Sequence, residues 1–176
     1  MRHLHARRLR SVPPPGFDCG REEQNAFLYD RAWEDQEAFL STTYLFFVGR
    51  MHAAYATVFM DAVPLGTGER GGIRYRDVSA LKLGQLGVSA RLQGQGVGRE
   101  VVNFVLELAY EIGERVACRY CTLDAQPDLV GWYETQGFRR NRVRQEERVA
   151  MARRHGRDPE AIPVSMRFDV RDGWSG

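Results

Sequence analysis

A glycine-rich stretch between an extended segment and a helix constrains this chain more than any other feature of its sequence. The extended segment covers 81–88, and glycines follow at Gly94, Gly96 and Gly98. An apolar periodicity then begins at once and predicts a helix over 97–112. Glycine is used where the backbone takes a positive φ or approaches another group closely. Because a helix N-terminus presents unpaired N–H groups, this order of elements suits a phosphate.

The spacing of the glycines excludes two familiar phosphate motifs. A P-loop requires a Lys-Ser or Lys-Thr pair after its last glycine, and this stretch has neither. A dinucleotide fingerprint fails in both registers, because neither register has a glycine at its third glycine position. The alternative is an ordinary tight turn from strand to helix, which three alternating glycines disfavour. The patterns that do fit are Gln93-x-x-Gly96-x-Gly98 and, in an overlapping register, Arg91-x-x-Gly94-x-Gly96.

This Q/R-x-x-G-x-G pattern resembles the acetyl-CoA-binding motif of the GNAT superfamily of N-acetyltransferases. Neighbouring blocks add to the resemblance. The segment Leu86-Gly87-Val88 is similar to the family's strand before the loop, and Leu123-Asp-Ala125 to a later strand. The segment Trp132-Tyr133-Glu-Thr-Gln-Gly137-Phe138 is similar to its Tyr-x-x-x-Gly-Phe helix end. Together these blocks cover 81–140.

A second, looser resemblance lies upstream. Phe17-Asp-Cys-Gly20, Phe27-Leu28 and Ser41-Thr-Thr-Tyr44 resemble the subset of GNAT proteins that includes aminoacyl-tRNA-acetylating toxins. This resemblance implies tRNA as a partner and a ribbon-helix-helix antitoxin as a second one. A homodimer is a further expectation.

The GNAT resemblance implies an α/β (α+β) fold in a single domain over 1–176. The expected sheet is mixed and central, with six to seven strands, about four flanking helices, and parallel strands splayed at the CoA site. Acetyl-CoA is the implied cosubstrate, and no metal is expected. The residues expected to bind the cofactor are Leu86, Gly87, Val88, Gln93, Gly94, Gln95, Gly96, Val97, Gly98 and Arg99.

The resemblance also implies a direct attack by an amine on the thioester, after which an acid must protonate the thiolate. Tyr133 matches the family's tyrosine for that task; the alternative is that Trp132 and Tyr133 only pack their helix onto the sheet. The spacing does not choose a general base among Glu22, Glu23, His52, Asp61 and Asp124. Because a free α-amine has a pKa of about 7.7–8.0 and lysine about 10.4, an α-amine acceptor needs less help from a base.

Two other functions stay open at this level. One is the acetylation of a small amine, such as a polyamine, a drug or an amino-acid derivative. The other is a CoA-binding regulatory module without catalysis, which an intact Tyr133 and glycine pattern disfavour. An acidic acceptor cleft would favour polyamines or cationic drugs, and a basic one would favour tRNA.

Composition limits the class of protein. The 176 residues are 43% hydrophobic and 27% charged, as in a globular protein. No apolar run approaches the ~20 residues that span a bilayer, and the basic N-terminus lacks the apolar core of a signal peptide. Three cysteines fit a reducing cytoplasm. The pair Cys118-x-x-Cys121 has no second pair beside it, so neither a metal site nor a redox role is expected.

A net charge of +2 conceals a local excess of arginine. Such a cluster can bind nucleic-acid phosphates. A solvated helix face is the alternative, because Lys82 is the only lysine of the chain and its cations are therefore nearly all arginine. The clustered arginines are Arg139, Arg140, Arg142, Arg144, Arg148, Arg153, Arg154 and Arg157.

The remaining sequence predicts an alternation of strands and helices around this stretch. A hairpin is predicted from 42–48 to 51–60 through Gly49-Arg50, followed by a mobile loop over 61–77. Gly113 is expected to end the helix that follows the glycines. Further strands are predicted over 2–10, 78–88, 116–123, 138–143 and 162–170, and further helices within 18–40, 127–136 and 145–155.

Overall fold

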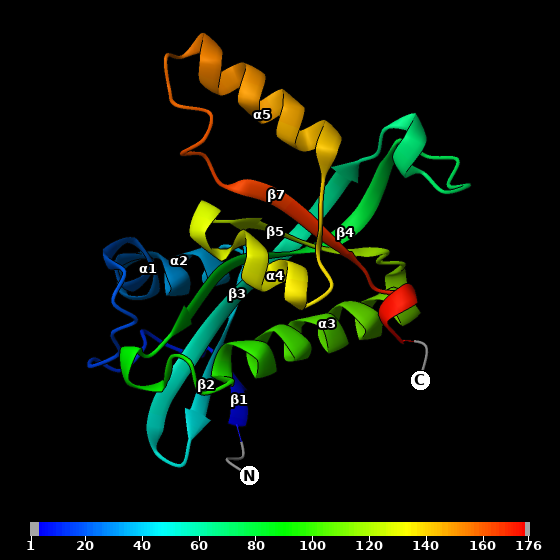
Figure 1. The fold of residues 1–176 in the computed structure, drawn as a ribbon. Helices are drawn as coiled ribbons and strands as arrows, with labels where there is room; N and C mark the ends of the chain where they lie inside the picture. Colours follow the sequence, from blue (N-terminus) through cyan, green and yellow to red (C-terminus); the bar gives the residue numbers. More distant parts are fainter. Residues whose placement is uncertain (1–3, 175–176) are drawn as a thin grey trace. The chain divides into compact units, whose positions relative to one another are not determined.

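The strands of this protein form one mixed sheet in the computed structural model, which describes residues 4–174 (Figure 1). Within these residues seven strands lie in the order β1-β2-β3-β4-β5-β7-β6, and the predicted GNAT-like sheet is confirmed. The strands are β1 (Leu4–Arg8), β2 (Thr42–Val48), β3 (Met51–Pro64), β4 (Asp77–Val88), β5 (Tyr120–Ala125), β6 (Arg139–Arg140) and β7 (Val164–Asp169). The helices are α1 (Glu22–Ala26), α2 (Ala32–Glu37), α3 (Val97–Val116), α4 (Val130–Thr135) and α5 (Arg142–Arg154), with a π-helical turn (Phe27–Arg31) between α1 and α2.

The chain divides into two compact units. Unit 1 contains Leu83–Glu107 and the described part of Met1–Phe59. Unit 2 contains Met60–Lys82 and the described part of Leu108–Gly176. Strands β3 and β4 and helix α3 each contribute residues to both units. The single domain over 1–176 stays a prediction.

Unit 1 is built on the predicted hairpin. Strands β2 and β3 pair antiparallel from Thr42 opposite Val58 to Val48 opposite Met51, and β1 pairs with the other edge of β2. Gly49 turns the hairpin with a φ of 60°, a conformation that favours glycine. The buried core of this unit is Leu9, Phe17, Cys19, Leu28, Ala32, Leu45 and Tyr55.

Unit 2 is built on antiparallel strands β5, β7 and β6. The pairs run from Tyr120 opposite Asp169 to Ala125 opposite Val164, and β6 adds Arg139 opposite Arg167. Just before β5, the N–H of Arg119 bonds to the carbonyl of Ser79 in β4, the strand next to β5 in the sheet. The buried apolar cluster of this unit consists of Val63, Leu65, Val78, Ala80 and Tyr120.

Helix α3 continues past Gly113, so the predicted stop at that residue is wrong. The helix ends at Val116, and Ala117 takes the left-handed conformation with a φ of 59°. The N–H of Ala117 bonds to the carbonyl of Gly113 at 3.2 Å, as at a helix end that glycine usually closes. A Cβ at Gly113 would stand 3.1 Å from the carbonyl oxygen of Cys118. Gly113 therefore serves a close backbone approach and not a helix stop.

Two predicted boundaries are also corrected. The loop predicted over 61–77 is shorter, because β3 extends to Pro64 and Leu65 N–H bonds to the carbonyl of Arg76 at 2.8 Å. The strand predicted over 138–143 shrinks to β6, and α5 begins at Arg142. Backbone pairing to β7 stops at Asn141, whose carbonyl accepts the N–H of Gln145 at 3.0 Å and so starts the helix.

Candidate functional site

The glycine loop, residues 89–99, runs from the end of β4 into the first turn of α3 in unit 1 (Figure 1). It opens with a 3-10 turn in which the N–H of Leu92 bonds to the carbonyl of Ser89 at 2.8 Å. Gly94 and Gly96 have φ angles of 72° and 87°, a region that side chains disfavour. No atom lies within 4 Å of the place where their Cβ atoms would stand. The backbone conformation requires these glycines, and they leave the surface of the loop open.

The N–H groups of the glycine loop are available to a ligand. The amide of Glu100 is the first of α3 to bond back into the loop, to the carbonyl of Gly96 at 3.2 Å. Among residues 4–174, no acceptor is found for the N–H groups of Gly94, Gly96, Val97 and Gly98. The helix behind them has 20 residues and places the positive end of its dipole here. The loop therefore fits the diphosphate of a nucleotide cofactor without any cationic side chain.

Two glutamines hold the loop in shape. The side-chain amide of Gln93 donates to the carbonyl of Cys19 at 2.8 Å and to that of Val88 at 3.1 Å. The amide of Gln95 donates to the carbonyl of Arg91 at 2.9 Å. The first residue of the Gln93-x-x-Gly-x-Gly pattern thus fixes the path of the backbone that the cofactor is predicted to meet.

The Phe17-Asp-Cys-Gly20 segment, whose Cys19 carbonyl accepts the Gln93 amide, makes further hydrogen bonds to the glycine loop and to α1. The carboxylate of Asp18 accepts the N–H of Gly20 and the amide of Asn25, each at 2.7 Å. These hydrogen bonds lower the pKa of Asp18. The carbonyl of Asp18 accepts the N–H of Ala90 at 2.9 Å. The segment that resembles the toxin subset thus connects α1 to the glycine loop, and Asn25 of α1, for which the sequence carries no evident signal, makes the contact.

The strand end Leu86–Val88 contains a glycine that packing requires. A Cβ at Gly87 would lie 2.5 Å from a ring carbon of Tyr55 and 3.4 Å from one of Phe17. Tyr55 is fully buried, and its hydroxyl donates to the carbonyl of Gln24 at 2.7 Å. Gly87 therefore lets β4 lie closely against an aromatic ring of β3, whatever role its backbone has toward a cofactor.

Tyr133, the predicted acid, belongs to unit 2 and lies on the short helix α4. It is buried and contacts Trp132 with a ring separation of 4.8 Å and Phe138 with one of 5.7 Å. Its carbonyl accepts the N–H groups of Gln136 and Phe138, which closes the helix before Gly137. The packing role proposed as an alternative is therefore present, and it does not exclude a catalytic role for the hydroxyl.

Two of the candidate bases form an ion-paired face in unit 2, defined by Asp61, Lys82, Asp124, Arg144 and Arg148. The Asp61 carboxylate accepts hydrogen bonds from both terminal guanidinium nitrogens of Arg144, at 2.6 and 3.1 Å. The Asp124 carboxylate accepts a hydrogen bond from the Lys82 ammonium at 2.6 Å. It also accepts hydrogen bonds from both terminal guanidinium nitrogens of Arg148, at 2.6 and 2.9 Å. Burial would raise the pKa of each carboxyl, but these cations together hold it below its ordinary value. Asp61 and Asp124 are therefore weak bases.

The other candidate bases lie in unit 1. His52 is stacked between Phe17 and Phe47, with ring separations of 4.5 and 5.2 Å, and burial lowers its pKa. Its Nε2 contacts the carbonyl of Ala54 at 3.1 Å, so the ring is held in place. Glu22 lies at the start of α1 and lines a cavity of about 490 Å³. This acidic cavity is lined by Asp18, Gly20, Glu22, Asn25, Ala26, Tyr29 and Asp30.

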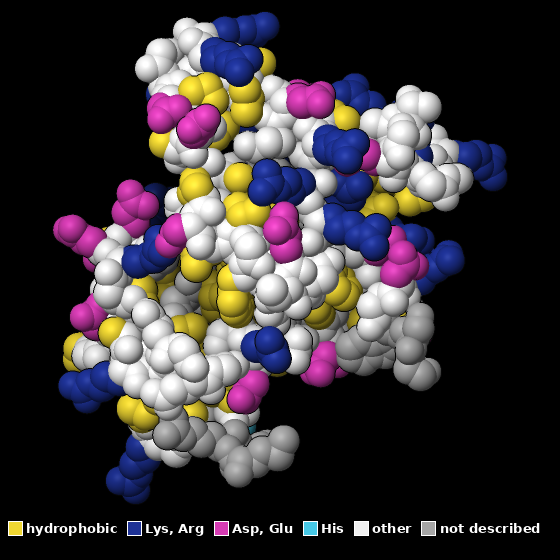
Figure 2. All heavy atoms as spheres, viewed as in Figure 1, with side chains coloured by type: hydrophobic (Ala, Val, Ile, Leu, Met, Phe, Trp, Pro, Cys, Tyr) yellow, Lys and Arg dark blue, Asp and Glu magenta, His cyan; other side chains and the backbone are white. Residues whose placement is uncertain are grey.

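The predicted arginine cluster divides into paired and unpaired members. Arg144 and Arg148 belong to the ion-paired face, and Arg140 pairs with Glu134 at 3.3 Å on the surface. In the part of the chain that the structure describes, no ion pair is found for five exposed members: Arg139, Arg142, Arg153, Arg154 and Arg157. Figure 2 shows cationic side chains standing out at the end of α5, next to carboxylates. A basic surface thus exists in unit 2, although it is smaller than the sequence predicts.

The three cysteines are buried and free. Burial raises the pKa of Cys118 and Cys121, which opposes the thiolate that metal binding or redox chemistry requires. Over residues 4–174, no group of three or more potential metal ligands is found. In the same range, helices long and apolar enough to cross a bilayer are absent.

A family model for the acetyltransferase (GNAT) domain matches residues 22–151, which is more than half of the chain. The chain belongs to the GNAT acetyltransferase family. Acetyl-CoA is the cosubstrate that this membership implies, and the match includes both the glycine loop and Tyr133.

Solved structures of similar fold include bacterial toxins. One, described as a bacterial toxin, has a TM-score of 0.77 at 16% identity and covers 98% of this chain and 93% of its own. A tyrosine-to-phenylalanine mutant of the toxin AtaT, bound to acetyl-CoA and the C-terminus of the antitoxin AtaR, has a TM-score of 0.71 at 18% identity over 97% and 95%. AtaT complexed with acetyl-methionyl-tRNA has a TM-score of 0.73 at 18% identity over 97% and 96%. Because the identities are only 16–18%, the likeness to these structures shows the fold of this chain and no more.

Proposed function

We propose that this GNAT acetyltransferase transfers an acetyl group from acetyl-CoA to the α-amine of an aminoacyl-tRNA and thereby acts as a toxin. The observation that carries the acetyl-CoA part is the row of N–H groups at Gly94, Gly96, Val97 and Gly98 without protein acceptors. The unpaired arginines on α5 and the complex of AtaT with acetyl-methionyl-tRNA support the choice of acceptor.

Both the diphosphate and the pantetheine arm of the cofactor would bind to backbone groups of unit 1. Its diphosphate would accept hydrogen bonds from the amides of Gly94, Gly96, Val97 and Gly98, at the positive end of α3. Its pantetheine arm would pair with the backbone of Leu86, Gly87 and Val88, as an added strand does. A backbone N–H near Val88 would then polarise the thioester carbonyl, in the manner of an oxyanion hole.

The chemical step is a direct transfer. The amine nitrogen attacks the carbonyl carbon, the C–S bond breaks, and the sulfur leaves as a thiolate that takes a proton from the hydroxyl of Tyr133. An ammonium acceptor must first lose one proton, and the attacking nitrogen loses a second as the amide forms, which balances the proton that Tyr133 gives to the thiolate. Asp61 and Asp124 are poorly suited to accept either proton from the nitrogen, because paired cations lower their pKa values. An α-amine is already partly neutral near pH 7.7–8.0, which favours that class of acceptor.

A second candidate function rests on the acidic cavity of unit 1. Three carboxylates, Asp18, Glu22 and Asp30, line a cavity of about 490 Å³. Carboxylates attract cations, so this cavity favours a polyamine or a cationic drug as the acceptor. The carboxylate of Asp18 is already engaged by Gly20 and Asn25, which weakens this reading.

A parallel acceptor assay tests the two functions against each other. Labelled acetyl-CoA is supplied with aminoacyl-tRNA, deacylated tRNA, a polyamine and free amino acids in separate reactions. We expect label on aminoacyl-tRNA and none on deacylated tRNA, because only the former carries the α-amine. Label on the polyamine alone would move the protein to the small-molecule class, and no transfer to any amine would indicate a regulatory CoA-binding module.

The partners proposed with the toxin function are an antitoxin of the ribbon-helix-helix class and a second copy of this chain. Co-expression with the product of a neighbouring gene should suppress acetylation and toxicity together. Toxicity that persists in the presence of every neighbouring gene product would contradict the antitoxin proposal.

A further inference from the structure

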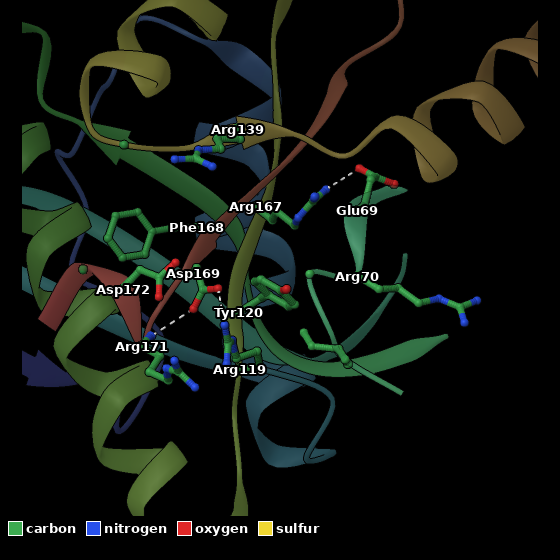
Figure 3. Close-up of a pocket in the computed structure, with 14 residues that line it drawn as sticks. Glu69, Arg70, Arg119, Tyr120, Arg139, Arg167, Phe168, Asp169, Arg171 and Asp172 are labelled. Atoms are coloured by element: carbon green, nitrogen blue, oxygen red, sulfur yellow. Dashed lines mark hydrogen bonds and ion pairs between the residues drawn. The ribbon is translucent and has the colours of Figure 1, made fainter. Parts of the chain in front are cut away.

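Unit 2 contains a cavity of about 540 Å³, which neither the glycine loop nor Tyr133 lines (Figure 3). We call it the arginine pocket. Its volume lies within the range of about 300–1,000 Å³ that small-ligand sites occupy. Its charged lining residues are the arginines Arg70, Arg119, Arg139, Arg167 and Arg171, and the acids Glu69, Asp169 and Asp172.

Two of these arginines are fixed by carboxylates. Arg167 donates to Glu69 at 2.8 Å, and Arg119 donates to Asp169 at 2.6 Å. The guanidinium carbon of each lies 5.8 Å from the ring centre of Tyr120. Figure 3 shows Tyr120 near both cations, from the neighbouring strands β5 and β7. Because the guanidinium groups are held in place before a ligand arrives, little conformational entropy remains to be lost on binding.

The pocket carries more positive than negative charge. Five arginines face three carboxylates, which leaves two positive charges in excess. Among residues 4–174 no ion pair is found for Arg139 or Arg171, and the Arg70 guanidinium bonds to the carbonyl of Leu65 at 3.3 Å. The Nε of Arg119 is buried and has no hydrogen-bond partner in the same described range. An anion of charge about −2 would complement this excess.

We propose that the arginine pocket binds a phosphate monoester, carried by a free nucleotide or by the 5′ end of an RNA. A monoester carries a charge of about −1.5 to −2 at pH 7, whereas a backbone diester carries −1. Its three terminal oxygens can accept hydrogen bonds from more than one guanidinium group at once, and each such group presents paired N–H donors. The proposal does not rest on acetyl transfer, because neither the glycine loop nor Tyr133 lines the pocket.

Paired RNA probes test this proposal directly. Binding of a short RNA with a 5′-phosphate is compared by fluorescence anisotropy with that of the same RNA with a 5′-hydroxyl, and AMP is tested as a competitor. We expect the phosphate to tighten binding about tenfold or more. Displacement by AMP at comparable concentration assigns the pocket to free nucleotides, and preference for the phosphorylated RNA without AMP competition assigns it to RNA ends.

Substitutions then locate the site. Arg139→Gln and Arg171→Gln, both at exposed side chains without ion pairs in the described structure, should together remove the phosphate preference and leave the melting temperature unchanged. Arg115→Gln, at an exposed arginine in the last turn of α3 that does not line the pocket, is the matched control and should keep the preference. A Gly96→Asp protein should also keep it, which separates this site from the glycine loop. Equal binding of the two RNAs with no binding of AMP, or an unchanged preference in the Arg139→Gln Arg171→Gln protein, overturns the proposal.

Discussion

The glycine loop of unit 1 and the ion-paired face of unit 2 offer binding groups by opposite means. The loop presents backbone N–H groups, and its two left-handed glycines contact no side chain at their Cβ positions. The ion-paired face holds five charged side chains in ion pairs with distances down to 2.6 Å. A backbone site keeps its chemistry through many side-chain changes, whereas a side-chain network fails when one partner is lost.

The largest effect is expected at the loop. Gly96→Asp adds a negative charge where the diphosphate is proposed to lie, in a conformation with a φ of 87° that strains any side chain. Acetyl-CoA affinity should fall about 100-fold or more, and the rise in melting temperature that the ligand gives should disappear. Gly156→Asp is the matched control, because Gly156 has a φ of 64° with nothing within 4 Å and lies beyond α5. Equal binding by the two variants would contradict the loop assignment.

The next effect concerns the side chain assigned to catalysis in unit 2. Tyr133→Phe removes one hydroxyl and keeps the ring contacts with Trp132 and Phe138. Because general acid catalysis contributes about 10²–10⁴-fold, kcat should fall on that scale while acetyl-CoA affinity stays the same. Tyr75→Phe, at a tyrosine that is 74% exposed, should change neither. An undiminished kcat would leave Tyr133 as a packing residue.

A third effect is expected in the stability of the ion-paired face. Asp124→Asn leaves Lys82 and Arg148 without their carboxylate, at side chains that are only 13% and 31% exposed. Loss of the carboxylate that both cations share should lower the free energy of unfolding by about 2–3 kcal/mol, measured by chemical denaturation. Arg76→Gln breaks the exposed pair with Glu147 and should cost about 0–1 kcal/mol. Similar losses in the two variants would show that burial adds nothing to the Asp124 network.

Acid should weaken the same face. The pKa of Asp61 is held below its ordinary value in the folded protein, so the stability that this carboxylate contributes is present above about pH 4, near its unfolded pKa. It is lost as the pH falls through the lower, folded pKa. The free energy of unfolding should therefore decline less steeply between pH 5 and pH 3 in Asp61→Asn than in the parent protein. Parallel declines would exclude Asp61 as a source of the acid sensitivity.

The smallest effect is expected for tRNA. Arg142→Glu, Arg153→Glu and Arg154→Glu reverse exposed cations of α5 that have no ion pair in the described structure. Together they should slow the acetylation of aminoacyl-tRNA several-fold and flatten its salt dependence, without changing acetyl-CoA affinity. Arg115→Glu, in the last turn of α3, is the control. Arg144 is left unchanged, because a carboxylate there would face Asp61. An unaltered salt dependence would favour a solvated helix face.

Local features were predictable from the sequence and distant pairings were not. The hairpin at Gly49 and the loop at Gly94 and Gly96 follow from glycine conformation, which acts within a few residues. The helix end at Gly113 was mispredicted because Cys118 approaches it and Ala117 takes the left-handed turn, a tertiary effect that no helical periodicity contains. The pairs of Asp61 with Arg144 and of Arg167 with Glu69 join residues 83 and 98 positions apart. Spacing therefore could not tell candidate bases from ion-pair partners.

The close packing at Gly87 has a consequence for how this chain can vary. The Tyr55 ring fills the volume that any side chain at position 87 would need, and Phe59 does the same opposite Gly84. Each glycine and its aromatic neighbour behave as one steric unit, so a larger residue on β4 becomes acceptable only when the ring on β3 shrinks. Diverging relatives that keep this register should therefore exchange bulk between 55 and 87 in coupled steps, and a library randomised at position 87 alone should return glycine.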